Sequence, residues 1–323
     1  MVEAIRASQG LVPRTPPNPH IYRRLIEELR TSVMLMDSAR EAHILLHPHD
    51  ALAHPENAAA AAPAAQDLAL PLVLLSESDH VGPSSVRHGT LYRSSICASR
   101  QTSNERVAAG FVPDLLDERD ARHPRALPWR DLPSVGFIGH ATHGIRSLGY
   151  LRRGWQHFHG FRLRERVLRA FEASPAVDAR FVRRTMNLGP PMAGVDVNEH
   201  RRRMRREYVD SVFACDYALC MRGAGNWSYR LFETLSAGRI PVLVDTDTLL
   251  PLEGEIDWTK HLCRIPASRL HDAGRLLAEF HADIGAAGFE RMQLANRKLW
   301  QERLEPAAFF GQLLRDNALR GDG

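Results

Sequence analysis

Three polar side chains near the middle of the sequence are spaced so that one helix would bring them together: Ser228, Arg230 and Glu233. A helix that opens on a glycine-rich loop presents unpaired backbone N–H groups and the positive end of its dipole, so it attracts phosphate. Arg230 could pair with phosphate oxygens, while Glu233, on the same face, could accept hydrogen bonds from ribose hydroxyls. An ordinary Arg/Glu pair on a solvated helix face has the same spacing.

The elements around these side chains follow from local patterns. The short apolar run Tyr217–Cys220 predicts a strand, and the glycines of Arg222–Gly225 permit a tight turn and close approach of a ligand. A helix should then begin near Ser228 and end before Gly238, which suits the left-handed position after a helix. Ile240–Val244 is a continuous apolar run, typical of a buried parallel strand.

With these residues in view, the segment resembles the hallmark region of the exostosin-like glycosyltransferases, which include heparan sulfate polymerases and plant cell-wall transferases. In that pattern a Ser and an Arg precede a Glu, followed by Gly-x-Ile-Pro-Val, an Asp that closes the strand, and Leu-Pro with a trailing Asp-Trp. The matching residues are Ser228, Arg230, Glu233, Gly238, Ile240, Pro241, Val242, Asp245, Leu250, Pro251, Asp257 and Trp258. The resemblance covers 208–260 well and the rest of the chain loosely, and Met221 stands where proline is commoner.

The resemblance implies an α/β fold of the GT-B type, with two Rossmann-like domains that face a cleft. We predict a loose N-terminal arm over 1–18, an acceptor-side domain over 19–130 and a nucleotide-sugar-binding domain over 131–323. The boundary is placed in 117–133, which is rich in Arg, Asp and Pro. Alternating strand and helix patterns agree with parallel sheets.

Composition fits such a protein. With 323 residues, 44% of them hydrophobic and 25% charged, the chain can form two globular domains. No stretch reaches roughly eighteen consecutive apolar residues and no apolar signal core is seen, so we expect a cytoplasmic protein. Lysine occurs only at Lys260 and Lys298, and this arginine bias favours a GC-rich, bacterial source. The four cysteines show no metal-ligand spacing.

The donor-binding prediction extends the central stretch to the first loop of the second domain. The expected donor is a nucleoside-diphosphate sugar, and of these we predict a UDP-sugar. We expect that the reaction requires no metal ion or other cofactor. The helix terminus and Arg230 would stabilise the leaving diphosphate. The predicted donor-binding residues are Gly139, His140, Arg222, Gly223, Asn226, Ser228, Arg230 and Glu233.

An inverting transfer also needs a base that takes the proton of the acceptor hydroxyl. Polar residues follow two apolar runs in the first half, where open α/β sheets place their ligands. Of these we favour Asp50 and Asp79 as catalytic residues, although the sequence does not identify the base. The other candidates are His49, Glu77, His140 and His143.

Two other functions stay open. Asp245-Thr-Asp247 has the spacing of a metal-binding Asp-x-Asp, which would make the protein a metal-dependent transferase. The chain could also be a non-catalytic glycan- or nucleotide-binding subunit of a polysaccharide assembly system. The expected partners are the donor and a glycan, lipid-linked or small-molecule acceptor. The basic run 201–206 is better explained as a solvated helix face than as a nucleic-acid patch, with peripheral contact to anionic lipid as an alternative.

Overall fold

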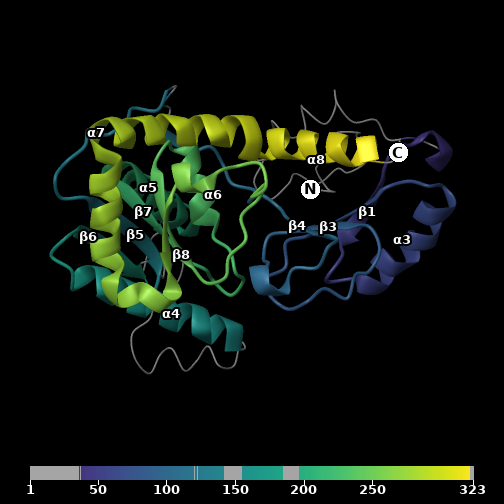
Figure 1. Cartoon of the computed structure of the whole chain (residues 1–323), viewed down its shortest axis with the longest axis horizontal. Helices are drawn as coiled ribbons and strands as arrows, with labels where there is room; N and C mark the ends of the chain where they lie inside the picture. Colours follow the sequence, from purple (N-terminus) through teal and green to yellow (C-terminus); the bar gives the residue numbers. More distant parts are fainter. Residues whose placement is uncertain are drawn as a thin grey trace.

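The computed structural model describes residues 36, 38–119, 121, 123–141, 155–184 and 196–320. Two parallel β-sheets lie side by side, and a long C-terminal helical segment runs along both of them (Figure 1). The α/β prediction with two parallel sheets is therefore confirmed, and it agrees with the GT-B plan. None of the helices in these ranges is long and apolar enough to cross a membrane.

The first sheet has the strand order β1-β2-β3-β4, and each pair of neighbours is parallel. Helix α3, Pro55–Asp67, connects the first two strands, while the later connections are loops with a short 3-10 turn at Ala98–Arg100. The strands are Leu45–Asp50, Leu72–Ser76, Thr90–Arg93 and Glu105–Val107.

The second sheet has the order β6-β5-β7-β8-β9, again all parallel. The order reverses between β5 and β7, and ligands of open α/β sheets bind outside the carboxyl ends of the strands at such a switch point. The strands β5 to β9 are Ser134–His140, Asp178–Arg184, Tyr217–Cys220, Ile240–Asp245 and Cys263–Pro266. The helices α4 to α7 are Trp155–Glu172, Val197–Ala214, Tyr229–Ser236 and Ala273–Leu299.

The central strands form where the sequence predicts them because their side chains are buried on both faces. Tyr217, Leu219, Ile240 and Val242 are fully buried in one core beneath α4 and α7. Burying each such side chain stabilises the fold by roughly 1.5–3 kcal/mol. Gly238 has φ +62°, so it ends α6 in the left-handed conformation that its type predicts.

The C-terminal helix α8, Pro306–Arg320, crosses back to the first sheet after a π-helical turn (Figure 1). Phe310 and Leu313 share a core with Val73 and Tyr92, and the Asn317 Nδ2 amide donates to the Tyr92 hydroxyl at 2.8 Å. The helix therefore adds to the core of the first sheet, although it lies in the range predicted for the second domain.

One strand of the first half begins later than its apolar run. The run 42–46, which ends in His47–Asp50, predicts a strand, and β1 is Leu45–Asp50 with Pro48 inside it. β1 is the edge strand of its sheet and its register shifts between Leu46 and Asp50, so a residue without an N–H is tolerated there. The predicted arm 1–18 and the helix expected near 21–29 lie outside the described residues.

Candidate active site

A pocket of about 530 Å³ opens at the switch point of the second sheet. Its walls come from the carboxyl ends of β5 and β7, from α4 and α5, and from the first turns of α6. Asp79 contributes to it from the first sheet. The pocket therefore opens between the two sheets, beside the start of α6, which is where the sequence predicts a nucleotide site.

Arg230 joins the two strands at this point. Its Nη1 donates to the Leu219 carbonyl at 3.2 Å and its Nη2 to the Ile138 carbonyl at 2.5 Å, at the ends of β7 and β5. The guanidinium lies over the Phe137 ring, 4.3 Å from its centroid. Within the described part of the chain, its buried Nε has no hydrogen-bond partner. Arg230 is thus held rigidly in the wall of the pocket by groups that carry no net negative charge.

A second arginine lies beside it. Arg164 of α4 donates from Nε to the Arg222 carbonyl and from Nη1 to the His140 carbonyl, both at 3.1 Å. Burial, and then the charge of Arg230, lowers the pKa of Arg164 to about 10. The cationic form is therefore disfavoured by its surroundings, and an anion placed between the two guanidiniums would relieve this cost.

Glu233 is buried and already has two donors. Arg205 donates to Oε1 at 2.6 Å and the Tyr208 hydroxyl to Oε2 at 2.5 Å, and Arg205 also binds Glu118. Burial, followed by the charge of Glu233, raises the pKa of Tyr208, so its phenol stays a donor at neutral pH. The carboxylate is fixed in the pocket wall, and its remaining lone pairs can accept ribose hydroxyls.

The start of α6 is open to the pocket. Ser228 is the N-cap, but its side chain makes no capping hydrogen bond, and both Ser228 and Gly223 line the pocket. The glycine-rich loop is packed closely by α4, because a Cβ on Gly160 would come within 2.1 Å of the Gly223 carbonyl oxygen. The site therefore depends on a glycine inside α4 that the sequence analysis did not single out.

Asn226, by contrast, lies beneath the site. It is fully buried, its Nδ2 donates to the carbonyls of Ile96 and Asp247, and its Oδ1 accepts from Thr246. These bonds join the loop after β7 to the first sheet. Asn226 does not line the pocket, and neither does Arg222, which faces a neighbouring one.

The two predicted bases have different surroundings. Asp79 lines the pocket and accepts from the Trp227 Nε1 at 2.9 Å, from across the cleft. Asp50 does not line it: this carboxylate accepts from the Ser76 hydroxyl, from the Glu77 N–H and from two N–H groups of the turn after β1. Asp50 thus ties β1 to β2, while Asp79 lines the pocket and contacts Trp227 of the second sheet's loop.

Of the remaining predicted residues, two line the pocket and two cannot be placed in it. Gly139 and His140 line the pocket, and the His140 ring packs against Phe161 with centroids 4.4 Å apart. The side chain of His49 and the whole of His143 lie outside the described residues.

The two Asp-x-Asp carboxylates are bonded away from the pocket, Asp245 within its own loop and Asp247 to the turn after β3. Asp245 accepts from the Thr248 N–H at 2.9 Å, and Asp247 accepts from the Ser99 hydroxyl at 2.5 Å. Neither lines the pocket. In the described part of the chain, no group of three or more His, Cys, Asp or Glu side chains is arranged to hold a metal ion.

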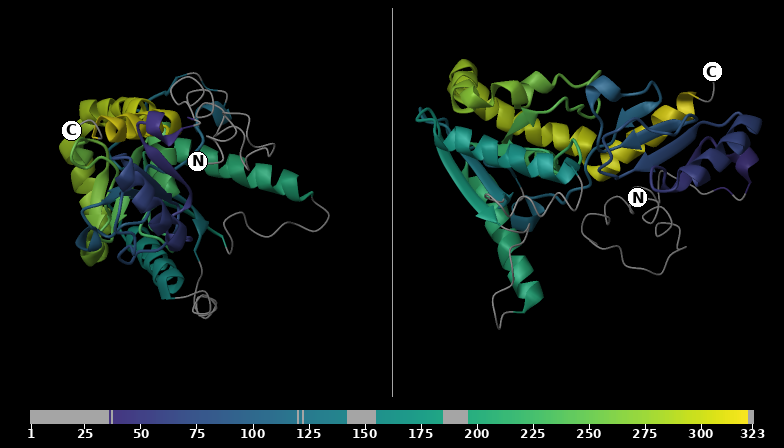
Figure 2. Two further views of the ribbon diagram at one scale, coloured as in Figure 1. Left: turned by 90° about the vertical axis from the view of Figure 1, so that its right-hand side faces the viewer. Right: turned by 90° about the horizontal axis from the view of Figure 1, so that it is seen from below.

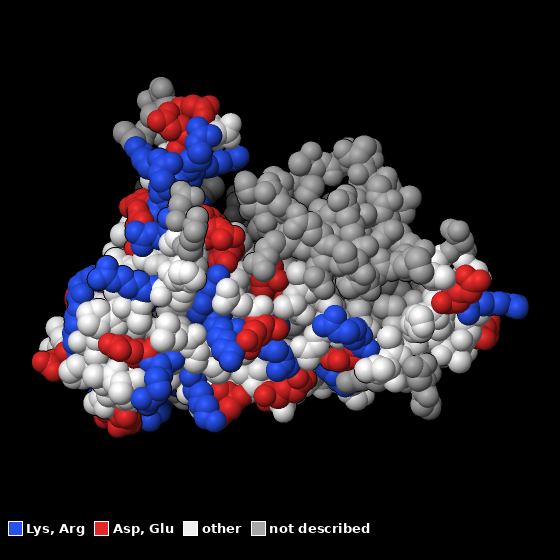
Figure 3. All heavy atoms as spheres, turned by 90° about the horizontal axis from the view of Figure 1, so that it is seen from above, with Lys and Arg blue, Asp and Glu red and all other residues white. Residues whose placement is uncertain are grey.

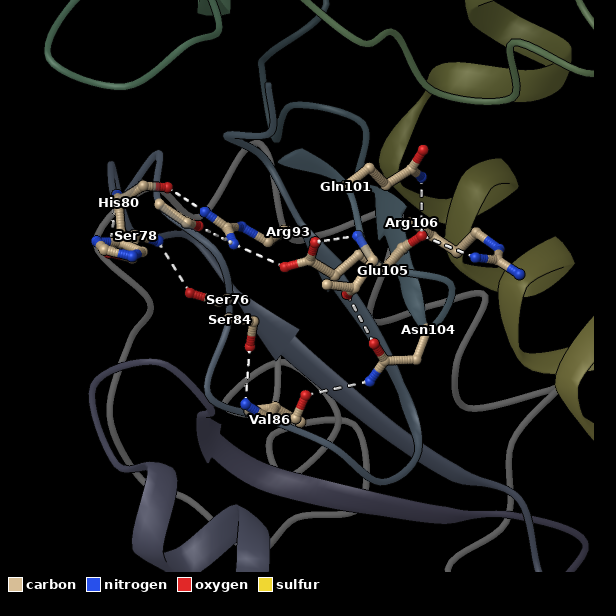
Figure 4. Close-up of polar contacts among 12 residues, drawn as sticks. Ser76, Ser78, His80, Ser84, Val86, Arg93, Gln101, Asn104, Glu105 and Arg106 are labelled. Carbon is tan, nitrogen blue, oxygen red and sulfur yellow. Dashed lines mark hydrogen bonds and ion pairs between the residues drawn. The ribbon is translucent and has the colours of Figure 1, made fainter. Parts of the chain in front are cut away.

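A buried ion pair holds the loop that carries Asp79 (Figure 4). Arg93 and Glu105 are each about 1% exposed and meet at 2.8 Å. Arg93 also donates to the carbonyl oxygens of His80 and Gly82, so it fixes the backbone next to Asp79.

Replacing Arg93 with methionine should therefore destabilise the protein by roughly 3–5 kcal/mol, because Glu105 is left buried without its partner. The double variant Arg93→Met/Glu105→Leu should recover only part of that loss, because both charges are gone but the carbonyl oxygens of His80 and Gly82 still lose their donor. Urea unfolding measures the difference, with exposed Arg100→Met as the control. Equal stability of Arg93→Met and wild type would show that the pair does not hold this loop.

With the geometry described, the comparisons with known proteins can be stated. Residues 162–280 match the family model of the Exostosin GT47 domain, which confirms the resemblance. Over that range the sequence has the pattern of an exostosin-like glycosyltransferase domain. The matched range begins inside α4 and ends inside α7, so it takes in β6, α5, β7, α6, β8 and β9. No curated protein matches the sequence.

Solved structures give distant similarities. HepE of Anabaena in complex with UDP is 11% identical, with 87% of this chain and 80% of that chain covered and a TM-score of 0.43. Sucrose-phosphate synthase of Thermosynechococcus elongatus is 12% identical, with 83% and 72% covered and a TM-score of 0.37. TarM is 10% identical with a TM-score of 0.37, and the match takes in 81% of this chain and 58% of that chain.

Sequence reasoning missed several side chains of the pocket, among them the polar or aromatic residues Arg164, Arg205, Tyr208 and Trp227. A signal existed for Arg205 and Tyr208, because their i,i+3 spacing puts them on one face of a predicted helix. Arg164 had no distinguishing signal within a helix that contains several other arginines.

Proposed function

We propose that the protein transfers a sugar from a UDP-sugar to a hydroxyl group of a glycan, lipid-linked or small-molecule acceptor. The observation that carries this proposal is the pair Arg164 and Arg230 at the switch point. Their described hydrogen bonds go to backbone carbonyls rather than carboxylates, so two cations face one pocket beside the start of a helix. A diphosphate is the complementary ligand. The uridine base is taken from the family resemblance.

The proposed mechanism is inverting. The diphosphate binds at Arg164, Arg230 and the N–H groups of the first turn of α6, while Glu233 accepts from the ribose. Asp79 takes the proton of the acceptor hydroxyl as its oxygen attacks the anomeric carbon, and the bond from that carbon to the diphosphate breaks. The guanidiniums stabilise the charge that develops on the leaving UDP, so no metal ion is needed.

The proposal includes a peripheral contact with anionic lipid and a cytoplasmic location. Helix α5 projects from the body of the protein (Figure 2), and arginine side chains gather on the projecting part (Figure 3). Exposed side chains on its first turns include Arg201, Arg202, Arg203 and Arg206. This surface could hold a lipid-linked acceptor near the pocket, since each basic residue near an anionic membrane adds about 1 kcal/mol.

Thermal unfolding with nucleotides tests the donor assignment. UDP should raise the unfolding temperature more than GDP, ADP, TDP or CMP, because a ligand of the folded state at 100 times its Kd stabilises it by roughly 2.7 kcal/mol. The shift and the turnover of a UDP-sugar should both survive EDTA.

Two outcomes would favour the other functions. Loss of both shift and turnover in EDTA would point to a metal-dependent transferase that uses Asp245 and Asp247. Binding of UDP without turnover of any UDP-sugar, over a panel of acceptors, would point to a non-catalytic binding subunit.

A further inference from the structure

A second pocket of about 420 Å³ adjoins the first on the other side of the loop after β7. Arg162, Leu163 and Arg166 of α4 line it together with Arg222 and Thr246. The side chains come from three separate segments, because Arg222 follows β7 and Thr246 follows β8. Of the described residues that line it, three are arginines and none is acidic. The pocket, here called the Arg222 pocket, is therefore strongly cationic.

Helix α4 divides its arginines between the two pockets. Arg162 and Arg166 are four residues apart and share one side of the helix, whereas Arg164 is two residues from each and points to another side. Arg164 lines the donor pocket and binds the Arg222 carbonyl at 3.1 Å. The backbone of the loop after β7 thus separates two cationic pockets, and α4 contributes arginines to both. Among the described residues, none lines both pockets.

Arg222 itself is incompletely bonded. Its Nη2 donates to the Ala224 carbonyl at 2.7 Å, but its buried Nε has no hydrogen-bond partner among the residues that the structure describes. Burial lowers the pKa of this side chain. A half-buried cation with an unused donor is costly unless an acceptor reaches it, and the best acceptor for a guanidinium is a multidentate oxyanion.

We propose that the Arg222 pocket binds a tetrahedral oxyanion carried by the acceptor, a phosphate or sulfate ester, while the donor diphosphate occupies the neighbouring pocket. Two guanidiniums from one face of α4 and a third from the loop supply the donors to the oxyanion, while the Thr246 hydroxyl, which donates to Asn226 Oδ1, only lines the pocket. The assignment of this oxyanion to the acceptor rests on the proposed function. The cationic site itself stands on the geometry of the Arg222 pocket alone.

The test keeps the donor pocket filled. Wild-type protein saturated with UDP is titrated calorimetrically with glucose 1-phosphate, with inorganic phosphate and with uncharged glucose. Glucose 1-phosphate should bind at one site and glucose should not. The variant Arg162→Gln/Arg166→Gln should weaken this binding at least tenfold and leave the Kd of UDP within twofold. Arg169→Gln is the matched control, since Arg169 lies on the same helix, is paired with Glu165 and does not line the pocket.

Each other result is decisive. Absence of phosphate binding to the UDP-saturated protein, or equal binding by the double variant, overturns the site. Inorganic phosphate that binds more tightly than glucose 1-phosphate overturns its assignment to the acceptor. If UDP itself fails to bind, the donor proposal fails, and the same titration without UDP still reports on the Arg222 pocket through the Arg162→Gln/Arg166→Gln variant.

Discussion

The Arg230→Ala variant should turn over a UDP-sugar roughly 100- to 1,000-fold more slowly than the wild type, because a fixed donor to the leaving group is lost. The structure adds a reason for so large an effect. Arg230 is locked to the carbonyls of Ile138 and Leu219, so its charge needs no rearrangement as the diphosphate departs. The affinity for UDP should fall as well, since the diphosphate loses one of its two guanidiniums. Steady-state kinetics and calorimetry measure both quantities.

Removing Arg230 also leaves two backbone acceptors without a donor, so a stability loss of about 1–3 kcal/mol is expected and must be separated from the kinetic effect. Arg230→Lys keeps the charge but loses the forked geometry, and should recover only part of the rate. Arg291→Ala removes an exposed arginine of α7 that does not line the pocket and serves as the control. A folded Arg230→Ala protein with near wild-type turnover would remove Arg230 from the mechanism.

The sequence predicts the second sheet well because its signals are local. The Tyr217–Cys220 strand has the predicted bounds, the next helix starts within a residue of Ser228, and Gly238 ends it. The crossing of α8 to the first sheet could not be foreseen, since it depends on Phe310 and its neighbours filling a core built by residues more than two hundred positions earlier. No local pattern records which of two sheets an apolar helix face will cover.

In the site, too, residues on one helix are predictable from the sequence, whereas contacts between separate helices are not. Ser228, Arg230 and Glu233 come together because one helix carries them, and spacing alone predicts that. The chemistry of Glu233 was less accessible, because its partners Arg205 and Tyr208 come from α5. The basic run that contains Arg205 was interpreted as a solvated face, which describes its exposed members but not this inward one.

The second large effect concerns the base. Asp79→Asn should lower kcat by roughly 100- to 10,000-fold, because general base catalysis contributes that much and an amide cannot accept the proton. The amide oxygen can still accept from the Trp227 Nε1, so the cleft contact and the affinity for UDP should be retained.

Asp50→Asn distinguishes this role from a structural one. Asp50 accepts hydrogen bonds through both carboxylate oxygens, from the Ser76 hydroxyl and from backbone N–H groups, so its amide variant should lose stability. At a temperature where it stays folded, it should keep kcat within about tenfold of wild type, a drop of at most about 1.4 kcal/mol in transition-state stabilisation. Single-turnover rates with a saturating UDP-sugar compare the two variants directly. If Asp50→Asn stops the reaction while Asp79→Asn does not, the base lies at the end of β1, and the pocket must then close further than its present geometry to reach it.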